Sequence, residues 1–242
     1  MRVVICENYA EMSRLAAEEI AAEMKKKKNF VLGLATGSTP VGTYGNLIEM
    51  NKQGEIDFTD VKTFNLDEYC GLYPNHDQSF NYFMYMNLFN YINIKNENVH
   101  VPFGFATDYD AWCKGYEAAI AEAGGLDLQL LGMGSNGHIG FNEPAEEFAE
   151  ITHTVELTES TIKDNSRFFA KIEDVPTSAV TMGIGTIMRA KKIVMVVNGA
   201  NKAKAVKEMI NGPVTPSMPA SALQNHPDVT VFVEKEAAKE IM

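Results

Sequence analysis

A histidine and a glutamate lie in one glycine-rich loop near the middle of the chain. The loop follows the apolar run 126–131, which has the composition of a strand buried on both faces. Its glycines allow sharp backbone turns, and its polar residues are Asn136, His138, Asn142 and Glu143. Imidazole and carboxylate groups transfer protons near neutral pH. A lone histidine would more simply be a polar side chain whose hydrogen bonds are satisfied within the fold. Four polar residues in one loop, with a histidine and a glutamate among them, instead indicate a functional site.

A second loop has the composition of an anion-binding site. Residues 30–34 form an apolar, strand-like run, and a helical pattern resumes at residue 41. The residues between them that could bind an anion are Thr36, Gly37, Ser38 and Thr39. Free N–H groups at a helix N-terminus bind phosphate, and neighbouring hydroxyls add donors. The loop is neither a Walker A loop nor a GxGxxG fingerprint, so a plain strand-to-helix turn remains the alternative.

Charged residues follow other predicted strands. Asp67 comes directly after the strand-like run 61–66, where a partly desolvated aspartate can accept a proton. The alternative is that Asp67 caps a turn or a helix. Lys202 stands where a helix is expected to begin, a position at which a cation opposes the helix dipole but suits an anion. Arg167 is a further candidate ligand for an anion.

These residues need a scaffold that brings distant loops together. Strand-like runs alternate with helical patterns along the chain, which favours one α/β domain over residues 1–242 with a single, mostly parallel sheet. Residues 145–175 show weak periodicity beside the glycine-rich loop, and we expect a lid there. The expected strands span residues 3–6, 30–34, 61–66, 99–102, 126–131, 152–157, 179–184, 192–197 and 229–233.

The carboxyl ends of parallel strands share one edge of a sheet. The loops at 35–40, 67–69, 132–143 and 198–202 should therefore meet in one crevice. The five histidines are scattered, so we expect no metal site, and no serine stands on a nucleophile elbow. The pattern favours proton transfer on a phosphorylated metabolite, by isomerisation, enolisation or hydrolysis, without a cofactor.

Composition limits the class of protein. Of the 242 residues, 45% are hydrophobic and 22% are charged, as in globular domains. The formal net charge of -11 disfavours nucleic acid as a partner. The three cysteines stand far apart, as reduced thiols do. The N-terminal apolar run is too short for a signal peptide and no stretch reaches the length of a membrane span, so we expect a soluble, cytoplasmic protein without a membrane partner.

Several segments together resemble the glucosamine-6-phosphate deaminases of the glucosamine/galactosamine-6-phosphate isomerase family. They are GLATGSTPVGTY, FNLDEYCGL, GMGSNGHIGFNEP, NSRFF and the helix start at Lys202, and the similarity spans nearly all of the chain. The resemblance implies a Rossmann-like three-layer α/β/α fold with a mostly parallel central sheet. It also implies conversion of glucosamine 6-phosphate and water to fructose 6-phosphate and ammonia, with no metal and no cofactor.

The resemblance further implies roles for individual residues. His138 would be the base that opens the pyranose ring, oriented by Glu143 and Asn136. Asp67 would move the C2 proton through an enolamine. The implied ligands of the substrate phosphate are Thr36, Gly37, Ser38, Thr39, Arg167 and Lys202.

One departure from the family pattern lies in the catalytic loop. Asn136 stands where other members carry aspartate. Its amide can still orient His138 by a hydrogen bond, but it adds no negative charge that would stabilise an imidazolium. We therefore expect His138 to remain a neutral base to lower pH than in relatives with aspartate.

A second departure concerns regulation. The longer, hexameric relatives bind N-acetylglucosamine 6-phosphate at a subunit interface, through basic residues that follow the FNEP loop. This chain has acidic or neutral residues there: Glu146, Glu147, His153, Val155 and Glu156. We expect no allosteric activation, and a monomer or small homo-oligomer.

Two alternatives remain open from the sequence. The first is a 6-phosphogluconolactonase, since these related enzymes share the sheet and a Gly-His loop but usually lack the FNEP ending. The second is a non-catalytic sugar-phosphate sensor, for which we would expect a DNA-binding helix pair before the first strand.

Overall fold

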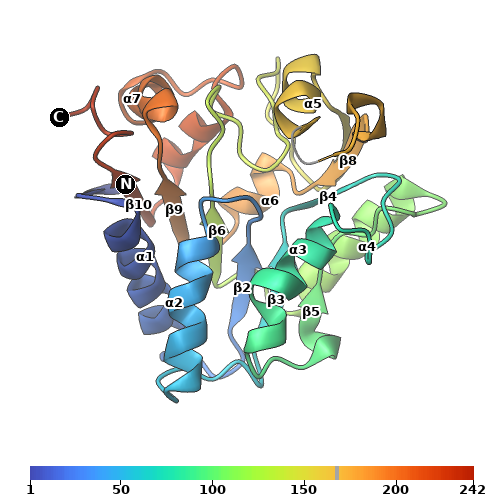
Figure 1. Ribbon diagram of the computed structural model, residues 1–242, viewed down its shortest axis with the longest axis horizontal. Coiled ribbons are helices and arrows are strands. Elements are labelled where there is room, and N and C mark those ends of the chain that lie inside the picture. The colour runs from blue at the N-terminus through green and yellow to red at the C-terminus, as the bar shows by residue number, and fades with distance from the viewer. Residues whose placement is uncertain (167–168) are drawn as a thin grey trace.

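The computed structural model describes residues 1–166 and 169–242, and Arg167 lies outside the described residues. Within them, seven strands form a central sheet in which every neighbouring pair is parallel (Figure 1). The expectation of a mostly parallel central sheet is confirmed. The strand order is β1 (Arg2–Cys6), β10 (Val229–Glu234), β9 (Ile193–Val197), β6 (Leu128–Leu131), β2 (Val31–Leu34), β3 (Lys62–Asn65) and β5 (Val99–His100).

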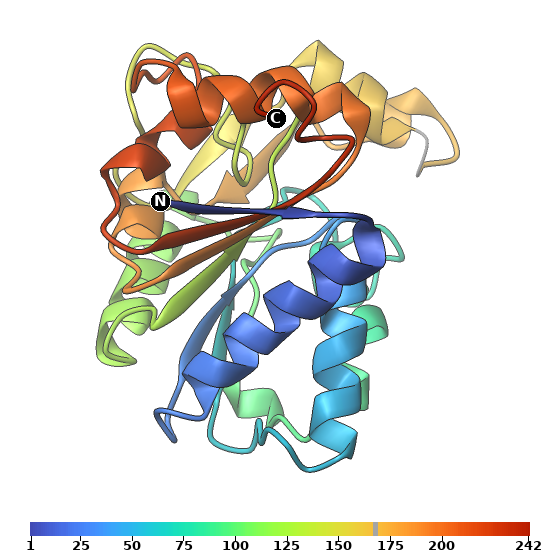
Figure 2. The same ribbon diagram turned by 90° about the vertical axis from the view of Figure 1, so that its left-hand side faces the viewer.

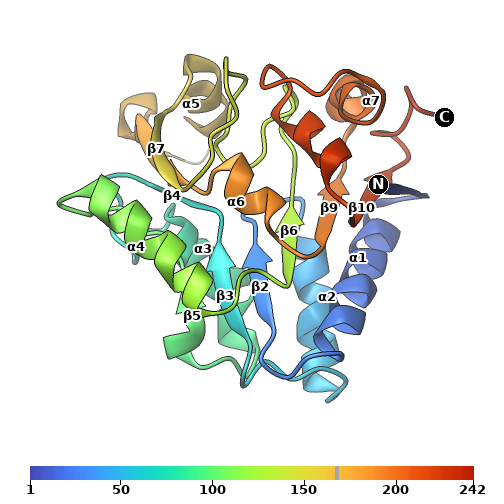
Figure 3. The same cartoon turned by 180° about the vertical axis from the view of Figure 1, so that it is seen from behind.

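Helices cover both faces of this sheet (Figures 2 and 3). The helices on one face are α1 (Tyr9–Met24), α2 (Val41–Lys52) and α3 (Phe80–Asn87). Those on the other face are α4 (Tyr109–Glu122), α6 (Ile184–Met188) and α7 (Ala203–Asn211). The predicted three-layer α/β/α architecture is confirmed. No helix in the described part of the chain is long and apolar enough to cross a membrane.

The two layers of core follow from the alternation of side chains along each strand. In β9, Val194 and Val196 pack with the α1–α2 layer, whereas Ile193, Met195 and Val197 pack with the opposite layer. Successive residues of a strand point to opposite faces, so a strand covered on both sides is apolar throughout. This is why the buried strands were recognisable as continuous apolar runs.

A second, antiparallel sheet was not predicted. Three strands of the described chain form it beyond the carboxyl edge of the central sheet, in the order β4 (Asp67–Tyr69), β8 (Ser178–Thr181), β7 (His153–Glu156). The expectation that residues 179–184 extend a single sheet is wrong. An apolar run reports burial but not which strand it pairs with. Here residues 178–181 pair with β4, and the chain then forms α6.

The segment 145–175, in which we expected a lid, contains β7, the helix α5 (Glu159–Asn165) and the 3-10 helix η4 (Ile172–Asp174). Thr158 caps α5, because its side chain accepts a hydrogen bond from the N–H of Thr161. Other 3-10 helices of the described residues are η1 (Phe89–Tyr91), η2 (Asn96–Asn98), η5 (Ala200–Lys202) and η6 (Pro219–Asn225).

Candidate active site

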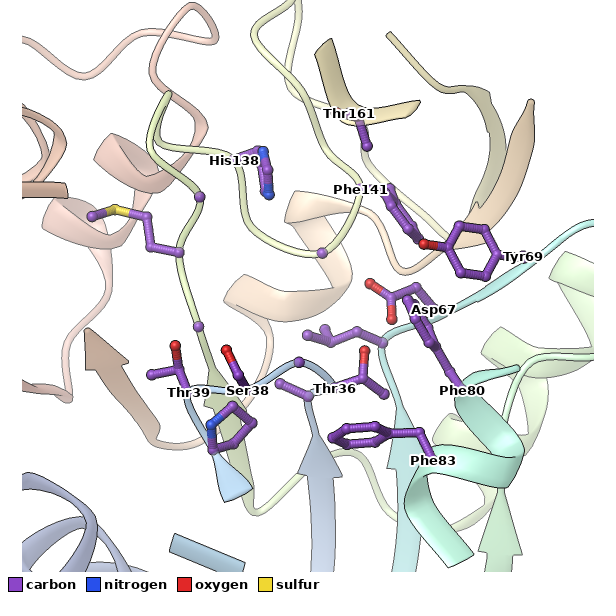
Figure 4. Close-up of a pocket in the computed structure, with 18 of the residues that line it drawn as sticks. Thr36, Ser38, Thr39, Asp67, Tyr69, Phe80, Phe83, His138, Phe141 and Thr161 are labelled. Atoms are coloured by element: carbon purple, nitrogen blue, oxygen red, sulfur yellow. The ribbon is translucent and has the colours of Figure 1, made fainter. Parts of the chain in front are cut away.

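The predicted loops border one pocket at the carboxyl edge of the central sheet, with a volume of about 530 Å³. This size suits a small metabolite. Figure 4 places Thr36, Ser38 and Thr39 along one side of the pocket, His138 on the opposite side and Asp67 between them. Lys202 also lines it. Residues that are 135 positions apart in the chain therefore face one cavity, because the ends of parallel strands meet there.

The loop after β2 has the geometry of an anion site. Gly37 has a φ of 96°, a left-handed conformation that favours glycine. Pro40 takes the N-cap position of α2 and offers no side-chain acceptor to the first N–H groups of the helix, although the N–H of Gly42 donates to the Tyr9 hydroxyl at 2.8 Å. Thr39 behaves differently from our expectation, since its hydroxyl donates to Asn198 Oδ1 at 2.7 Å and ties this loop to the loop after β9. The hydroxyls of Thr36 and Ser38 face the pocket.

Lys202 is the last residue of η5 and immediately precedes α7. Burial lowers the pKa of its ammonium group, and in the described parts of the chain no carboxylate pairs with it. A cation that is partly desolvated and unpaired is prepared to bind an anion, because an anion would replace the lost solvation. Its place on the pocket wall with the 36–39 loop fits a phosphate.

Asp67 is 6% exposed and is the first residue of β4. Its Oδ1 atom has no hydrogen-bond partner among the described residues. Burial raises the pKa of Asp67 to about 8, and the neighbouring Glu68 carboxylate adds to this effect. A more basic carboxylate is a better acceptor for a proton bound to carbon.

Gly140 allows the catalytic loop to pass directly over Asp67. Its φ is 60°, and a Cβ atom at this position would lie 2.8 Å from Thr181 Oγ1 and 3.5 Å from Asp67 Oδ2. A side chain would therefore collide with β8 and crowd the carboxylate.

The adjacent Glu68 has a structural role. It is 1% exposed, and its carboxylate accepts hydrogen bonds from the backbone N–H groups of Phe80 and Asn81, each at 2.9 Å, and of Tyr69. These bonds satisfy donors at the N-terminus of α3 that would otherwise be unpaired. Of the two neighbouring carboxylates, only Asp67 lines the pocket.

Asn136 contacts His138 differently from our expectation. Its Nδ2 donates to Glu143 Oε2 at 2.6 Å, and its Oδ1 accepts the backbone N–H of His138 at 3.1 Å. The imidazole itself faces Glu143, with Nδ1 3.5 Å from Oε1. Burial raises the pKa of Glu143, but the neighbouring His138 imidazole and the hydrogen bonds from Thr161 and Asn136 outweigh it and lower that pKa to about 2. Glu143 is therefore an anion across the physiological range.

Aromatic side chains form a wall of the pocket that sequence reasoning missed. Tyr69 and Phe80 lie with their ring centroids 4.8 Å apart, and Phe80 stacks on Phe141 at 5.8 Å. Aromatic side chains of this kind commonly pack in a core, yet Phe80 and Phe83 both line the pocket. One signal was available for Tyr69, because it lies two residues after Asp67 and residues so spaced in a strand share a face. Phe169 also joins this wall.

The remaining histidines do not assemble a metal site. His100 stacks on Phe64 with ring centroids 4.3 Å apart, and a ring nitrogen of His226 lies 2.7 Å from the carbonyl oxygen of Ala190. Across the described residues, no cluster of His, Cys, Asp and Glu side chains could hold a metal ion.

Residues 7–232 match the model of the family described as glucosamine-6-phosphate isomerases/6-phosphogluconolactonase. The chain belongs to this family. The resemblance found in the sequence is thereby confirmed, and it covers most of the chain.

Two relatives illustrate the degree of similarity. A glucosamine-6-phosphate deaminase of Thermoanaerobacter pseudethanolicus is 59% identical over 238 residues, covering 98% of this chain and 94% of the relative. A glucosamine-6-phosphate deaminase of Clostridium perfringens is 53% identical over 239 residues, covering 99% of both proteins.

Solved structures of the family have the same fold. A monomeric glucosamine-6-phosphate deaminase superposes with a TM-score of 0.96 at 43% identity, covering 99% of this chain and 100% of that chain. A 6-phosphogluconolactonase of Thermotoga maritima superposes with a TM-score of 0.75 at 21% identity, covering 97% of this chain and 99% of that chain. At this lower identity the likeness concerns the fold alone.

Proposed function

We propose that the protein converts glucosamine 6-phosphate and water to fructose 6-phosphate and ammonia, as a hydrolytic deaminase that also isomerises an aldose to a ketose. The observation that carries this proposal is the juxtaposition of Asp67, His138 and an anion-binding loop on one pocket. The names of the relatives that are 52–59% identical support the same substrate.

The substrate phosphate would bind to the N–H groups and hydroxyls of the 36–39 loop and to the Lys202 ammonium group. Such fixed donors are needed because the protein carries a net charge of -11, which repels a phosphate dianion at long range. Screening reduces that repulsion within about 8 Å at physiological salt, so donors close to the phosphate decide its binding. The aromatic wall would pack against the carbon chain of the sugar. Arg167 stays a candidate phosphate ligand from the sequence.

Ring opening is the step assigned to His138. Its imidazole would take the proton from the anomeric hydroxyl and return a proton to the ring oxygen as the C1–O5 bond breaks. The imidazolium formed in between would be stabilised by the Glu143 carboxylate beside Nδ1. Asn136 would help by holding that carboxylate in place.

Isomerisation and deamination are assigned to Asp67. Its carboxylate would remove the proton from C2 of the open-chain aldehyde while O1 takes a proton from solvent, which gives an enolamine. The carboxyl would then deliver its proton to C1 and leave a protonated imine at C2. The resulting C2 imine adds water and releases ammonia, which leaves the ketone of fructose 6-phosphate. A carboxyl with a pKa of about 8 can both accept and return a proton near neutral pH.

A lactonase is the second candidate, because the description of the matching family includes 6-phosphogluconolactonase. The two reactions place different demands on the pocket. A lactonase needs only a base that activates water, whereas a deaminase also needs a separate base for the proton on C2. Asp67 and His138 provide two separate bases on one cavity.

The purified protein should be incubated with glucosamine 6-phosphate, and ammonia and fructose 6-phosphate should be measured in separate coupled assays. We expect both products in equal amounts, and no turnover of glucosamine, which lacks the phosphate. Hydrolysis of 6-phosphogluconolactone without release of ammonia from the amino sugar would contradict the proposal and favour the lactonase.

A further inference from the structure

Helix α5 reaches the Glu143 carboxylate through the side chain of Thr161. Thr161 is 9% exposed and lines the pocket, and its Oγ1 forms a hydrogen bond with Glu143 Oε1. Figure 4 shows Thr161 beyond Phe141, on a different segment from His138. The contact joins residues 18 positions apart, so it depends on how α5 packs against the catalytic loop.

The direction of the hydrogen bonds around Thr161 follows from the charge of Glu143. The pKa of this carboxyl, lowered to about 2, makes it an anion that can only accept hydrogen bonds. The Thr161 hydroxyl must then donate, and its oxygen accepts from the Thr158 hydroxyl at 3.0 Å. Thr158 in turn accepts the backbone N–H of Thr161 at 3.2 Å. The cap of α5 and the carboxylate therefore belong to one oriented chain of hydrogen bonds.

This arrangement gives each oxygen of Glu143 a neutral donor. Thr161 donates to Oε1, and Asn136 donates to Oε2 at 2.6 Å. His138 Nδ1 stays 3.5 Å from Oε1 and has no hydrogen-bond partner among the described residues. Thr161 and His138 thus both approach Oε1, and of the two only Thr161 forms a hydrogen bond with it.

We propose that Thr161 is a positioning residue of this site: by donating to Oε1 of Glu143 it weakens the interaction of that carboxylate with the imidazole of His138, the base assigned to ring opening. The importance of this role for catalysis rests on the proposed function, because only ring opening needs that base. Packing of α5 against the loop then sets how strongly Glu143 acts on His138.

The test replaces the Thr161 hydroxyl without changing the size of the side chain. In Thr161→Val, Oε1 loses its neutral donor, keeps more of its negative charge and interacts more strongly with Nδ1–H of the imidazolium. We expect the titration midpoint of the His138 ring, followed by NMR, to rise by about half a unit to one unit. The acid limb of kcat/KM should move by the same amount, and kcat should fall about tenfold with little change in KM. Thr161→Ser, which keeps the hydroxyl, should behave like the wild type.

Other titratable groups near the imidazole are common to all variants. Those that line the pocket are Asp67, Tyr69, Asp77 and Lys202, and those on α5 whose side chains the structure describes are Glu159 and Lys163, both exposed. A difference between the valine and serine variants can therefore be assigned to the hydroxyl.

Thr152 offers a matched control. It is 1% exposed and its hydroxyl donates to Glu117 Oε1 at 2.6 Å, so Thr152→Val also removes a buried bond between a threonine and a carboxylate. Neither residue lines the pocket. We expect a lower Tm in this variant, with the titration of His138 and kcat unchanged.

An unmoved His138 titration in Thr161→Val, or a serine variant that titrates like the valine variant, would overturn the proposal. The NMR titration needs no substrate, so it tests the role of Thr161 even if the protein releases no ammonia. If circular dichroism shows that Thr161→Val is unfolded, Thr161→Ala provides the same comparison with Thr161→Ser.

Discussion

A buried carboxylate without a partner is unfavourable for folding, and Asp67 is such a group. Its Oδ1 atom is buried and has no hydrogen-bond partner among the described residues. The same desolvation that costs stability makes the carboxyl more basic. Asp67 therefore combines a cost in folding with a gain in proton transfer, a pattern expected of functional sites.

Asp67→Asn should abolish activity and increase stability at alkaline pH. The pKa of Asp67 rises from 3.8 to about 8 on folding, so between these values the folded state binds more protons than the unfolded state. Stability contributed by this group is therefore present below about pH 4 and is lost as pH rises to about 8. We expect kcat to fall about 1000-fold, and the variant to be more stable than the wild type by about 1 to 3 kcal/mol at pH 8. Denaturant unfolding at pH 8 and pH 4 measures this, and an equal difference at both pH values would contradict the pKa shift.

Lys202→Ala should weaken binding of the phosphate. Loss of a charged donor costs about 1.5 to 3 kcal/mol, so KM for glucosamine 6-phosphate should rise about tenfold or more. Lys204 is the matched control, because it lies two residues later, in α7, with its side chain 79% exposed. Steady-state kinetics of both variants test this, and equal KM values would remove Lys202 from the phosphate site.

Asn136→Asp tests the effect of the amide in the catalytic loop. Asn136 donates to Glu143 Oε2, and an aspartate there would place a second carboxylate against Glu143 and near the imidazole. Additional negative charge favours the imidazolium, so the acid limb of kcat/KM should move to higher pH. A pH–rate profile measures the shift, and an unmoved limb would show that the charge at this position does not act on His138.

Individual helices and loops fix the positions of the side chains that line the pocket. The Glu68 carboxylate fixes the start of α3, which places Phe80 and Phe83 on the pocket. Ser79 caps the same helix, because its side chain accepts a hydrogen bond from the N–H of Tyr82. The loop after β6 likewise holds His138, because its backbone passes close to the ring.

Gly134→Ala should displace the imidazole. A Cβ atom at Gly134 would lie 2.2 Å from Cε1 and 2.4 Å from Nε2 of His138, so the ring must turn away. Misplacement of a catalytic group can cost about 100-fold, and we expect kcat to fall by that order. Gly115→Ala in α4 is the control, because open space surrounds that position and alanine there should stabilise the helix by about 0.5 to 1 kcal/mol. Wild-type kcat in Gly134→Ala would show that the loop can adjust.

At the scale of the whole molecule, the second sheet connects the pocket to the exposed surface. Its edge strand β7 pairs only with β8 in the described chain and carries His153, Val155 and Glu156. Glu146, Glu147 and Glu156 are exposed and give this segment of the chain negative charge. A phosphate would be repelled there.

The protein should therefore show no allosteric activation. We expect hyperbolic kinetics that N-acetylglucosamine 6-phosphate does not activate, and a monomer or small homo-oligomer by light scattering. The monomeric deaminase with the same fold agrees with the smaller assembly. The control is inorganic phosphate at equal ionic strength. A sigmoidal curve made hyperbolic by the N-acetyl sugar phosphate would contradict this prediction.

The sequence by itself determined the central sheet and the loops that border the pocket. Continuous apolar runs located the buried strands, and the alternation of strands with helices implied that their carboxyl ends meet. Ser79 and Asp108 were recognisable as helix caps, because a cap depends only on residues a few positions away.

Only the tertiary structure decided which partners these residues have. It placed residues 67–69 in a second sheet. It also showed that Thr39 forms a hydrogen bond with Asn198 and that Thr161 forms one with Glu143. Local patterns report burial and backbone preference, whereas these pairings join segments 18 to 159 residues apart. Contacts between different elements stabilise these pairings, so the periodicity within one segment does not predict them.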